Sequence, residues 1–321
     1  MKAAVLHELG KIPRYEDFPE PTPANDEVLI HVKAAALSRI SRSRASGSHY
    51  DSYRQLPAVC GMDGVGLLDD GTRVFCGGSR APYGTMAELT VVPRFWTMPV
   101  PNGIDDLTAA ALPNAALSSW LPLVYRAQIR EGENVLILGA TGVAGKVAVQ
   151  IAKNLGAGRV TAAGRNEEIL NTLNALGADT VIPLNRSDEE VAEAFSSENS
   201  KHPINIVLDY VWGHPVELLV SALTRHDVMA EEGRIRLISI GSLAGQVASI
   251  PSAALRSSGL EIYGSGGGSI SRQAIAETFP KLWKLAASGK LRIEVEPVPL
   301  ADVEKTWNRQ DTNGRRIVFI P

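Results

Sequence analysis

The sequence has very few cysteines and no long basic run, and we expect no apolar run that approaches the length of a membrane span. Cys60 and Cys76 are its only two cysteines, too few for a disulfide framework or a four-cysteine zinc site. The formal net charge is −3, so we expect neither nucleic acid nor an anionic membrane as a partner. The chain also reaches the charged residues Lys2 and Glu8 too soon for the apolar core of a secretory signal. These absences predict a cytoplasmic protein in a reducing compartment.

Length and composition are those of a globular protein with more than one domain. Apolar residues make up 45% and charged residues 21% of the chain, ordinary proportions that exclude the disordered and fibrous classes. The 321 residues exceed the size at which a single hydrophobic core usually stops growing. We therefore expect two domains.

One stretch, VLILGATGVAG at residues 135–145, carries the strongest functional signal. Its first four residues are aliphatic, as in a strand of a parallel sheet that is buried on both faces. Gly139, Gly142 and Gly145 then follow at three-residue spacing. In a nucleotide-binding turn the first glycine takes an otherwise forbidden φ, the second lets backbone N–H groups approach a diphosphate, and the third lets the helix pack closely on its strand. The predicted helix runs to Gly156, and its positive N-terminus faces the turn.

Two alternatives compete with the dinucleotide interpretation. A phosphate-binding loop of the ATPase type needs a glycine where Ala140 stands and a Ser or Thr where Val147 stands, so the ending Gly145-Lys146 does not make one. The plain alternative is a turn that only connects a strand with a helix. The strand and helix on either side favour the dinucleotide site, whose expected cofactor-binding residues are Gly139, Ala140, Thr141, Gly142, Val143, Ala144 and Gly145.

The end of the next predicted strand, residues 159–163, indicates which dinucleotide is bound. NAD-selective sites place an Asp or Glu about 20 residues past the glycines, whereas NADP sites place an Arg near the 2′-phosphate. Here the strand is followed by Gly164, Arg165 and Asn166, with no acid at its end. We expect Arg165 to pair with the 2′-phosphate, and the alternative is that Arg165 is an ordinary surface residue. The sequence thus predicts NADP(H).

The pattern of elements changes along the chain and locates the two domains. Before Asp105 the apolar runs are short and strand-like, and Asp70-Gly71 between two of them predicts a hairpin, so this part is typical of an antiparallel barrel. After Asp105 strands alternate with helices, one of which begins with the capping box Ser187 and Glu190. This alternation predicts a doubly wound sheet, with the active site in the cleft between the domains. Six strands are expected, at residues 135–138, 159–163, 180–182, 204–209, 234–240 and 260–263, and a C-terminal strand at 316–320 is expected to return to the first domain.

This order of a small barrel, a dinucleotide fold and a returning C-terminal segment resembles the medium-chain dehydrogenase/reductase superfamily. The finer motifs resemble its zinc-independent quinone oxidoreductase branch. They lie at residues 1–4, 32–35, 56–66, 139–145, 176–179 and 314–318. The resemblance implies an α/β protein with a GroES-like β-barrel catalytic domain at residues 1–116 and 267–321 and a Rossmann NADP-binding domain at residues 117–266. It also implies a homodimer in which the strand at residues 260–263 pairs across a two-fold axis.

Zinc-dependent members of this superfamily would carry metal ligands near Ser38, Asp63 and Asn114, and of the residues present there only Asp63 could serve. The four-cysteine lobe of members with structural zinc is also missing. We therefore expect no metal. The six histidines show no ligand spacing with the cysteines and are expected to be surface or packing residues: His7, His31, His49, His202, His214 and His226.

Without a metal, the resemblance implies hydride transfer from NADPH to a quinone or an α,β-unsaturated carbonyl compound, because the developing negative charge delocalises to oxygen and hydrogen-bond donors then suffice. By position in the family pattern, the wall of the site involves Ser38, Tyr50, Asp63, Asn114 and Ser118. The residues expected to line the nicotinamide are Gly241, Ser242, Gly264, Ser265 and Gly266.

Several of these residues have a second interpretation. We expect Tyr50 to donate a hydrogen bond to the acceptor, but a small insertion in its loop lets Tyr53 compete, and a loop tyrosine also serves as a packing residue. Asp63 could instead be structural. Either cofactor contact or core packing fits three residues after the fourth strand: Asp209, Tyr210 and Trp212.

The segment with Arg39, Arg42 and Arg44 departs from what the resemblance implies. Three arginines in so short a segment ordinarily form a solvated helix face. The alternatives are recognition of an anionic substrate and help in holding the cofactor phosphates. The sequence leaves all three open.

Two functions from different classes remain. The first is an NADPH-dependent, zinc-independent reductase of quinones or enones. The second is a non-catalytic NADPH-binding protein, such as a redox sensor or a crystallin-like relative. A short-chain dehydrogenase would need a tyrosine followed four positions later by lysine, and no tyrosine in this sequence has that partner.

Overall fold

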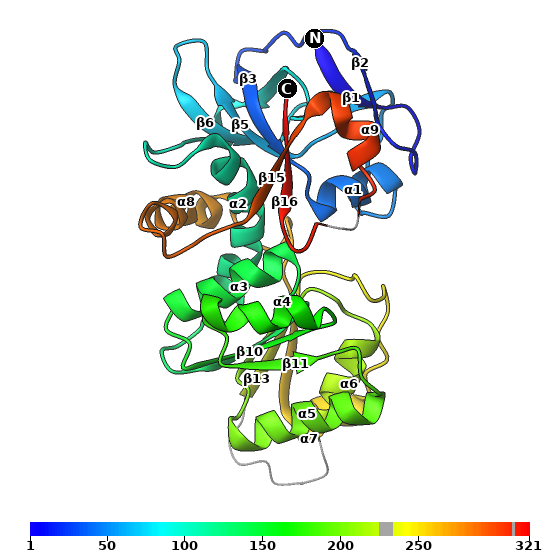
Figure 1. Cartoon of the computed structure of the whole chain (residues 1–321), viewed down its shortest axis with the longest axis vertical. Helices are drawn as coiled ribbons and strands as arrows, with labels where there is room; N and C mark the ends of the chain where they lie inside the picture. The colour runs from blue at the N-terminus through cyan, green and yellow to red at the C-terminus, as the bar shows by residue number, and fades with distance from the viewer. Residues whose placement is uncertain (225–233, 310–311) are drawn as a thin grey trace. The chain divides into compact units, whose positions relative to one another are not determined.

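The structure is a computed structural model that describes residues 1–224, 234–309 and 312–321 (Figure 1). It forms two compact units. The first unit comprises residues 1–114 and 281–321, and the second unit comprises residues 115–280. The second unit ends inside helix α8, Arg272–Ala287, whereas the predicted nucleotide-binding domain is residues 117–266. Those domain limits stay a prediction.

The first unit is built from two mainly antiparallel sheets. The small sheet has the order β2-β1-β4, with β1 Lys2–Leu6, β2 Arg14–Asp17 and β4 Ala58–Val59. The larger sheet has the order β15-β16-β3-β5-β6-β8, and β7 pairs with β3. Its strands are β3 Glu27–Ala36, β5 Asp63–Leu67, β6 Arg73–Gly77, β7 Leu89–Pro93, β8 Thr97–Pro99, β15 Val295–Pro299 and β16 Arg316–Ile320. The helices wholly in this unit are α1 Arg39–Ser46 and α9 Val303–Thr306.

Two sequence predictions about the first unit are confirmed. Asp70-Gly71 forms the tip of the β5–β6 hairpin, where Leu67 pairs with Arg73 and Gly71 has a φ of 82°. The C-terminal strand β16 returns to this unit, because Val318 pairs with Ala36 of β3. β16 therefore lies between β3 and β15 and joins them in one sheet.

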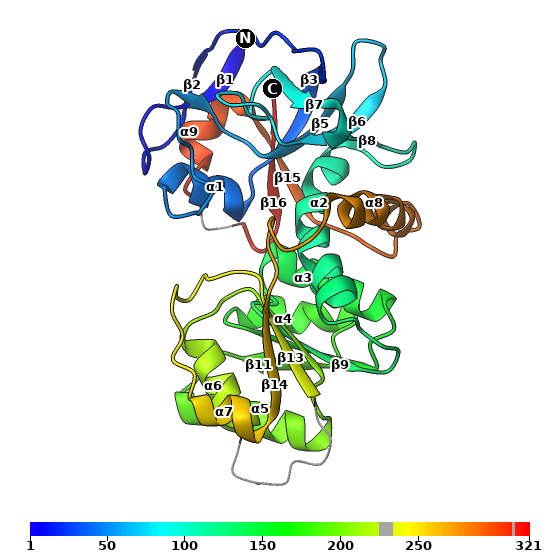
Figure 2. The ribbon, with the colours of Figure 1, turned by 180° about the vertical axis from the view of Figure 1, so that it is seen from behind.

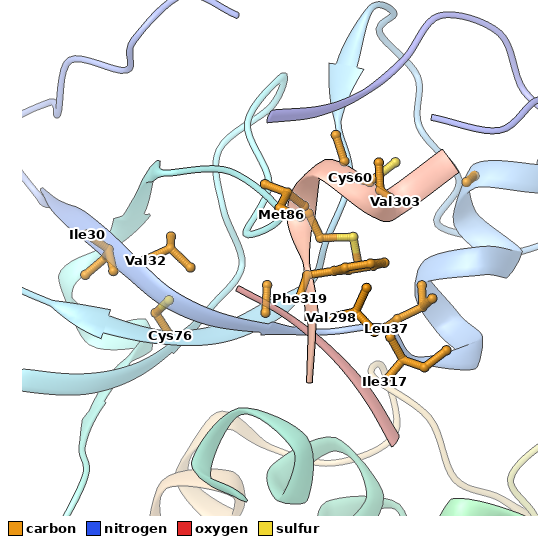
Figure 3. Packing of buried hydrophobic residues seen from close by; sticks show 14 of the residues in the cluster. Ile30, Val32, Leu37, Cys60, Cys76, Met86, Val298, Val303, Ile317 and Phe319 are labelled. Atoms are coloured by element: carbon orange, nitrogen blue, oxygen red, sulfur yellow. The ribbon is translucent and has the colours of Figure 1, made fainter. Parts of the chain in front are cut away.

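The core of the first unit joins segments that lie far apart in the sequence (Figure 3). Phe319 of β16 is fully buried, and Figure 3 shows its ring beside Met86 and Val298. Leu37 and Ile317 belong to the same cluster. Burying a side chain of this size contributes about 2–3 kcal/mol. The cluster therefore fixes β16 and the start of α1, two elements that supply candidate site residues.

The second unit is a six-stranded, all-parallel sheet with the order β11-β10-β9-β12-β13-β14. Its strands are β9 Asn134–Leu138, β10 Arg159–Gly164, β11 Thr180–Pro183, β12 Ile206–Asp209, β13 Arg234–Ser239 and β14 Gly259–Gly264. Its helices are α3 Val143–Asn154, α4 Glu167–Thr172, α5 Asp188–Lys201, α6 His214–Leu223 and α7 Ser252–Ser257. The predicted doubly wound sheet with six strands is confirmed.

Helices cover both faces of this sheet. α5, α6 and α7 share one hydrophobic cluster with it, whereas α3 contacts β9 and β10 from the opposite side (Figure 1). Residues 135–138 of β9 are buried, as the aliphatic run predicts for a strand covered on both faces. Figure 2 shows β14 beside β13, and β14 is the last strand at that end of the sheet.

The expectation that no apolar segment reaches the length of a membrane span is wrong. Helix α2, Asp106–Leu121, continues into a π-helical turn, Pro122–Arg126, and the joined segment of 21 residues is long and apolar enough to cross a membrane. However, 67% of its most apolar window is buried inside the protein. A helix in the core of a soluble protein has the same composition, because it is apolar all round.

Candidate functional site

The turn between β9 and α3 has the geometry predicted for its three glycines. Gly139 has a φ of 86°, which side-chain-bearing residues rarely adopt. A Cβ on Gly142 would meet no atom closer than the Gly139 carbonyl oxygen at 3.5 Å, so this position is open. A Cβ on Gly145 would lie 2.5 Å from the Cα of Ala140, so the helix contacts the turn directly. The backbone at each glycine therefore has the geometry expected of a dinucleotide-binding turn.

The N-terminus of α3 is open to an anion. Its N-cap is Gly142, which has no side chain to accept a hydrogen bond from the first turn, and that turn contains no acidic residue. The first N–H groups of a helix lack acceptors within the helix, and the helix dipole adds positive potential there. This end of α3 thus fits the diphosphate of a dinucleotide.

The end of β10 lies against the same turn. A Cβ on Gly164 would lie 2.6 Å from Cγ2 of Thr141, so a side chain at position 164 would displace Thr141. Arg165 is exposed, and Asn166 caps α4 by accepting a hydrogen bond from the Ile169 N–H at 3.1 Å. Asn166 is therefore a helix cap in this structure, and its contact with cofactor stays a prediction.

Sequence reasoning missed the residues around Glu167, the first residue of α4. Its carboxylate accepts hydrogen bonds from Asn185 at 2.9 Å and from Arg186 at 3.0 Å. Because this acid already has cationic and amide partners, its repulsion of a phosphate near Arg165 is reduced. No spacing in the sequence signals this contact, since Asn185 and Arg186 follow a different strand.

The segments after β13 and β14 lie at the same carboxyl edge of the sheet, where open α/β sheets bind their ligands. A Cβ on Gly241 would lie 2.6 Å from the Tyr210 carbonyl oxygen, so only glycine fits there. Ser265 N–H donates to the Ser239 carbonyl at 2.9 Å, and Gly266 N–H donates to Ser269 Oγ at 2.8 Å. The exposed residues Ser242 and Gly264 complete the set predicted to line the nicotinamide.

Asp209 organises the loop after β12. Its buried carboxylate accepts hydrogen bonds from the N–H groups of Val211 and Trp212, each at 2.9 Å. Burial raises the pKa of Asp209 to about 6. Trp212 has a φ of 54°, a strained conformation for a residue with a side chain, and the two hydrogen bonds to Asp209 hold it there.

Tyr210 connects this loop to α2 inside the second unit. Its hydroxyl forms a hydrogen bond with Ser119 Oγ at 2.8 Å and donates to the Ser118 carbonyl at 3.2 Å. Burial raises the pKa of Tyr210 to about 12, so the hydroxyl stays protonated. The sequence left cofactor contact and core packing open for Tyr210. In the structure Tyr210 is a buried packing residue. Ser119 was missed, because nothing in the pair Ser118-Ser119 marks which serine is buried.

The predicted wall residues lie in different environments. Ser38 is buried and caps α1 by accepting a hydrogen bond from the Ser41 N–H at 3.2 Å. Asn114 is partly exposed on α2, and one turn later Ser118 donates its hydroxyl to the Ala115 carbonyl at 2.8 Å. Because Asn114 and Ser118 are four residues apart on one helix, they lie on the same face.

The two competing tyrosines differ sharply in exposure. Tyr50 is 77% exposed, and its ring stacks on His49 with centroids 4.0 Å apart. Tyr53 packs against the core of the first unit beneath the Arg44 guanidinium, 4.8 Å from its ring centre. Burial raises the pKa of Tyr53, and its hydroxyl is enclosed. Of this pair, only Tyr50 has an exposed side chain, and its role as a donor stays a prediction.

Asp63 lies in a buried group of charges with two arginines. It is 7% exposed, its Oδ1 has no hydrogen-bond partner, and burial raises its pKa to about 7 although Arg316 opposes this. Arg316 is 6% exposed, and its Nη1 donates to the Leu37 carbonyl at 3.1 Å. The repulsion from Arg42 adds to burial in lowering the pKa of Arg316 to about 10. Sequence reasoning missed Arg316 as a site residue, because it lies 279 positions from Leu37.

Metal-ligating side chains are not grouped in the described part of the chain. No three or more His, Cys, Asp or Glu side chains there could hold a metal ion. Cys60 and Cys76 are both buried and unpaired, and burial raises the pKa of each thiol to about 12. His226, one of the six histidines, lies outside the described residues.

The chain is similar to several characterised sequences and structures. The sequence profile of the zinc-binding dehydrogenase family matches residues 144–288. A probable NADPH-dependent quinone reductase of Emericella nidulans is 29% identical, with 96% of each chain covered. The chloroplastic NADPH-dependent alkenal/one oxidoreductase of Arabidopsis thaliana is 31% identical over 53% of this chain and 48% of the relative. The quinone oxidoreductase of Thermus thermophilus, whose structure was also solved with NADPH, is 30% identical over the full length of both chains, with a TM-score of 0.82.

Proposed function

The chain belongs to the medium-chain dehydrogenase/reductase superfamily, in its quinone oxidoreductase-like branch, and we propose that it reduces quinones or α,β-unsaturated carbonyl compounds with NADPH. The observation that carries this proposal is the turn of Gly139, Gly142 and Gly145. It leads into helix α3, whose N-cap Gly142 has no side chain to accept a hydrogen bond from the first turn. The similarity to quinone reductases and to an alkenal/one oxidoreductase supports the acceptor class. When bound, NADPH supplies the hydride.

The residues of the second unit bind and orient the cofactor. The N-terminus of α3 takes the diphosphate, and Arg165 takes the 2′-phosphate, which would be repelled by a carboxylate at that position. Gly241 and Gly264 leave room beside the cofactor ring at the ends of β13 and β14. Asp209 and Tyr210 hold the loop after β12 in a single conformation.

The predicted wall residues and Tyr50 serve the acceptor. A conjugated carbonyl gains negative charge on oxygen as it accepts hydride, so a donor aimed at that oxygen stabilises the transition state. We propose that the exposed hydroxyl of Tyr50 is this donor and that Ser38, Asp63, Asn114 and Ser118 form the wall. Because conjugation spreads the charge, these groups act without a metal.

The Tyr50→Phe variant tests this assignment and separates an enzyme from a non-catalytic NADPH-binding protein. Removing a donor to a developing oxyanion lowers kcat by about 100-fold, while the Kd for NADPH stays unchanged. Tyr83→Phe, on another loop of the first unit, is the matched control and keeps full activity. If neither variant changes turnover, Tyr50 is not the donor; if the wild type binds NADPH and reduces no quinone or enone, the sensor function is favoured instead.

We also propose a cytoplasmic homodimer. Strand β14 lies at the end of the six-stranded sheet, so one edge of its backbone pairs with no strand of the described residues. Antiparallel pairing of two β14 strands across a two-fold axis would remove that edge. Light scattering coupled to gel filtration tests this directly, because a mass near 34.3 kDa would show a monomer.

A further inference from the structure

The arginines of the segment 39–44 do not form a simple solvated face. Arg39 is exposed, but Arg42 is only partly exposed, and its Nε is buried with no hydrogen-bond partner. Its Nη2 donates one long hydrogen bond, 3.4 Å, to the Arg309 carbonyl. Burial, with the nearby charge of Arg39, lowers the pKa of Arg42. Arg42 therefore holds a charge in a partly dehydrated position, and no acidic side chain among residues 1–224, 234–309 and 312–321 forms an ion pair with it.

Arg316 contributes a second donor at the same place. It is buried, and its Nε also has no hydrogen-bond partner. Its Nη1 reaches the carbonyl of Leu37, directly before the N-cap of α1, and its charge is close enough to Arg42 for the two to repel. Within the part of the chain that the structure describes, the acid that acts on Arg316 is Asp63. Arg42, Arg316 and Asp63 together carry a net charge of +1 when Asp63 is ionised and +2 when it is protonated.

The first turn of α1 adds positive potential to this cluster. It contains no acidic residue, and Ser38 satisfies only the N–H of Ser41. The other first-turn N–H groups lack acceptors within the helix. A buried excess of positive charge with unsatisfied donors is unfavourable unless an anion completes it. A guanidinium pairs its Nε–H and a neighbouring Nη–H with the two oxygens of an oxyanion, which fits a carboxylate or a sulfonate.

We propose that Arg42, Arg316 and the N-terminus of α1 bind the anionic group of the acceptor, so that quinones or enones carrying a carboxylate or a sulfonate are the favoured substrates. This inference rests on the proposed function, because Ser38 and Asp63, both assigned to the acceptor wall, adjoin the cluster. The cofactor diphosphate already has its own uncapped helix terminus at α3, so the arginines are assigned to the acceptor.

A pair of quinones that differ by one charged group tests the proposal. We would compare kcat/KM for 1,4-naphthoquinone and for 1,4-naphthoquinone-2-sulfonate in the wild type, Arg42→Met, Arg42→Lys and Arg14→Met. Arg14 is an exposed arginine of β2, so its variant removes the same charge away from the cluster and serves as the control. We expect Arg42→Met to lower the ratio of anionic to neutral turnover by about tenfold or more, and Arg42→Lys to restore part of it.

Two results would overturn the proposal. One is an unchanged ratio in Arg42→Met; the other is a weaker Kd for NADPH together with equal losses for both quinones, which would assign the arginines to the cofactor. Calorimetric titration with 2-naphthalenesulfonate measures binding of the anion without turnover. It therefore tests the site even if the protein reduces no quinone or enone. Tenfold weaker binding to Arg42→Met than to Arg14→Met supports the site, and equal binding refutes it.

Discussion

Replacing Gly142 and Gly145 by alanine should separate cofactor binding from folding. A methyl group at position 145 would lie 2.5 Å from the Cα of Ala140 and would also overlap the carbonyl oxygen of Gly139. Either the helix or the turn must therefore move. Overpacking of this kind costs about 1–3 kcal/mol of unfolding free energy. At position 142 the methyl would have an ordinary contact at 3.5 Å, and the φ of −79° suits alanine, so the cost is below about 1 kcal/mol.

The two variants should rank in the opposite order for NADPH binding. Gly142→Ala, which costs less unfolding free energy than Gly145→Ala, should weaken NADPH binding more. The methyl of Gly142→Ala stands where a phosphate approaches the open helix end, so losing one charge-assisted hydrogen bond raises the Kd for NADPH by about tenfold or more. Gly77→Ala in β6, whose nearest contact is also 3.5 Å, is the control and should bind normally. Urea unfolding and fluorescence titration of NADPH measure both quantities. Wild-type affinity in Gly142→Ala, or wild-type stability in Gly145→Ala, would refute this account of the turn.

Three further predictions concern the second unit. Arg165→Glu should fold normally because the residue is exposed, and its preference for NADPH over NADH, measured as a ratio of kcat/KM, should fall by about tenfold or more; an unchanged ratio would make Arg165 an ordinary surface residue. Tyr210→Phe removes the hydrogen bonds to Ser119 and the Ser118 carbonyl and should lower the unfolding free energy by about 1–2 kcal/mol in urea titrations, whereas no change would show that the link to α2 is unimportant. Burial raises the pKa of Asp209 from 3.8 to about 6, so between these pH values the folded protein holds a proton that the unfolded chain releases. Asp209 therefore makes the unfolding free energy fall as the pH rises from 3.8 to about 6, by at most ~3 kcal/mol. In Asp209→Asn that decline should be smaller than in the wild type, and an equal decline in both would contradict the assignment.

The features that the sequence predicted correctly depend on local constraints. Gly139 and Gly145 were interpretable because a positive φ and a close helix contact each exclude a side chain. The hairpin at Asp70-Gly71 and the capping box of Ser187 with Glu190 are likewise present as predicted, because each involves only neighbouring residues. The burial of β9 followed from an aliphatic run of strand length.

The features that escaped prediction depend on contacts between distant segments. The sequence places Tyr50 and Tyr53 in one loop, but only packing against the core of the first unit and beneath Arg44 shows that Tyr53 is enclosed. Arg316 reaches Leu37 only because β16 pairs with β3, and no local pattern encodes that approach. The charged cluster therefore becomes visible in the structure alone.

The most direct test of the proposed function is anaerobic oxidation of NADPH by chelator-treated protein, with one naphthoquinone and one simple enone as acceptors and NADH measured in parallel. We predict turnover that survives chelation and is faster with NADPH than with NADH. Absence of turnover with both acceptors, or activity that disappears with the chelator and returns with zinc, would contradict a metal-independent NADPH reductase.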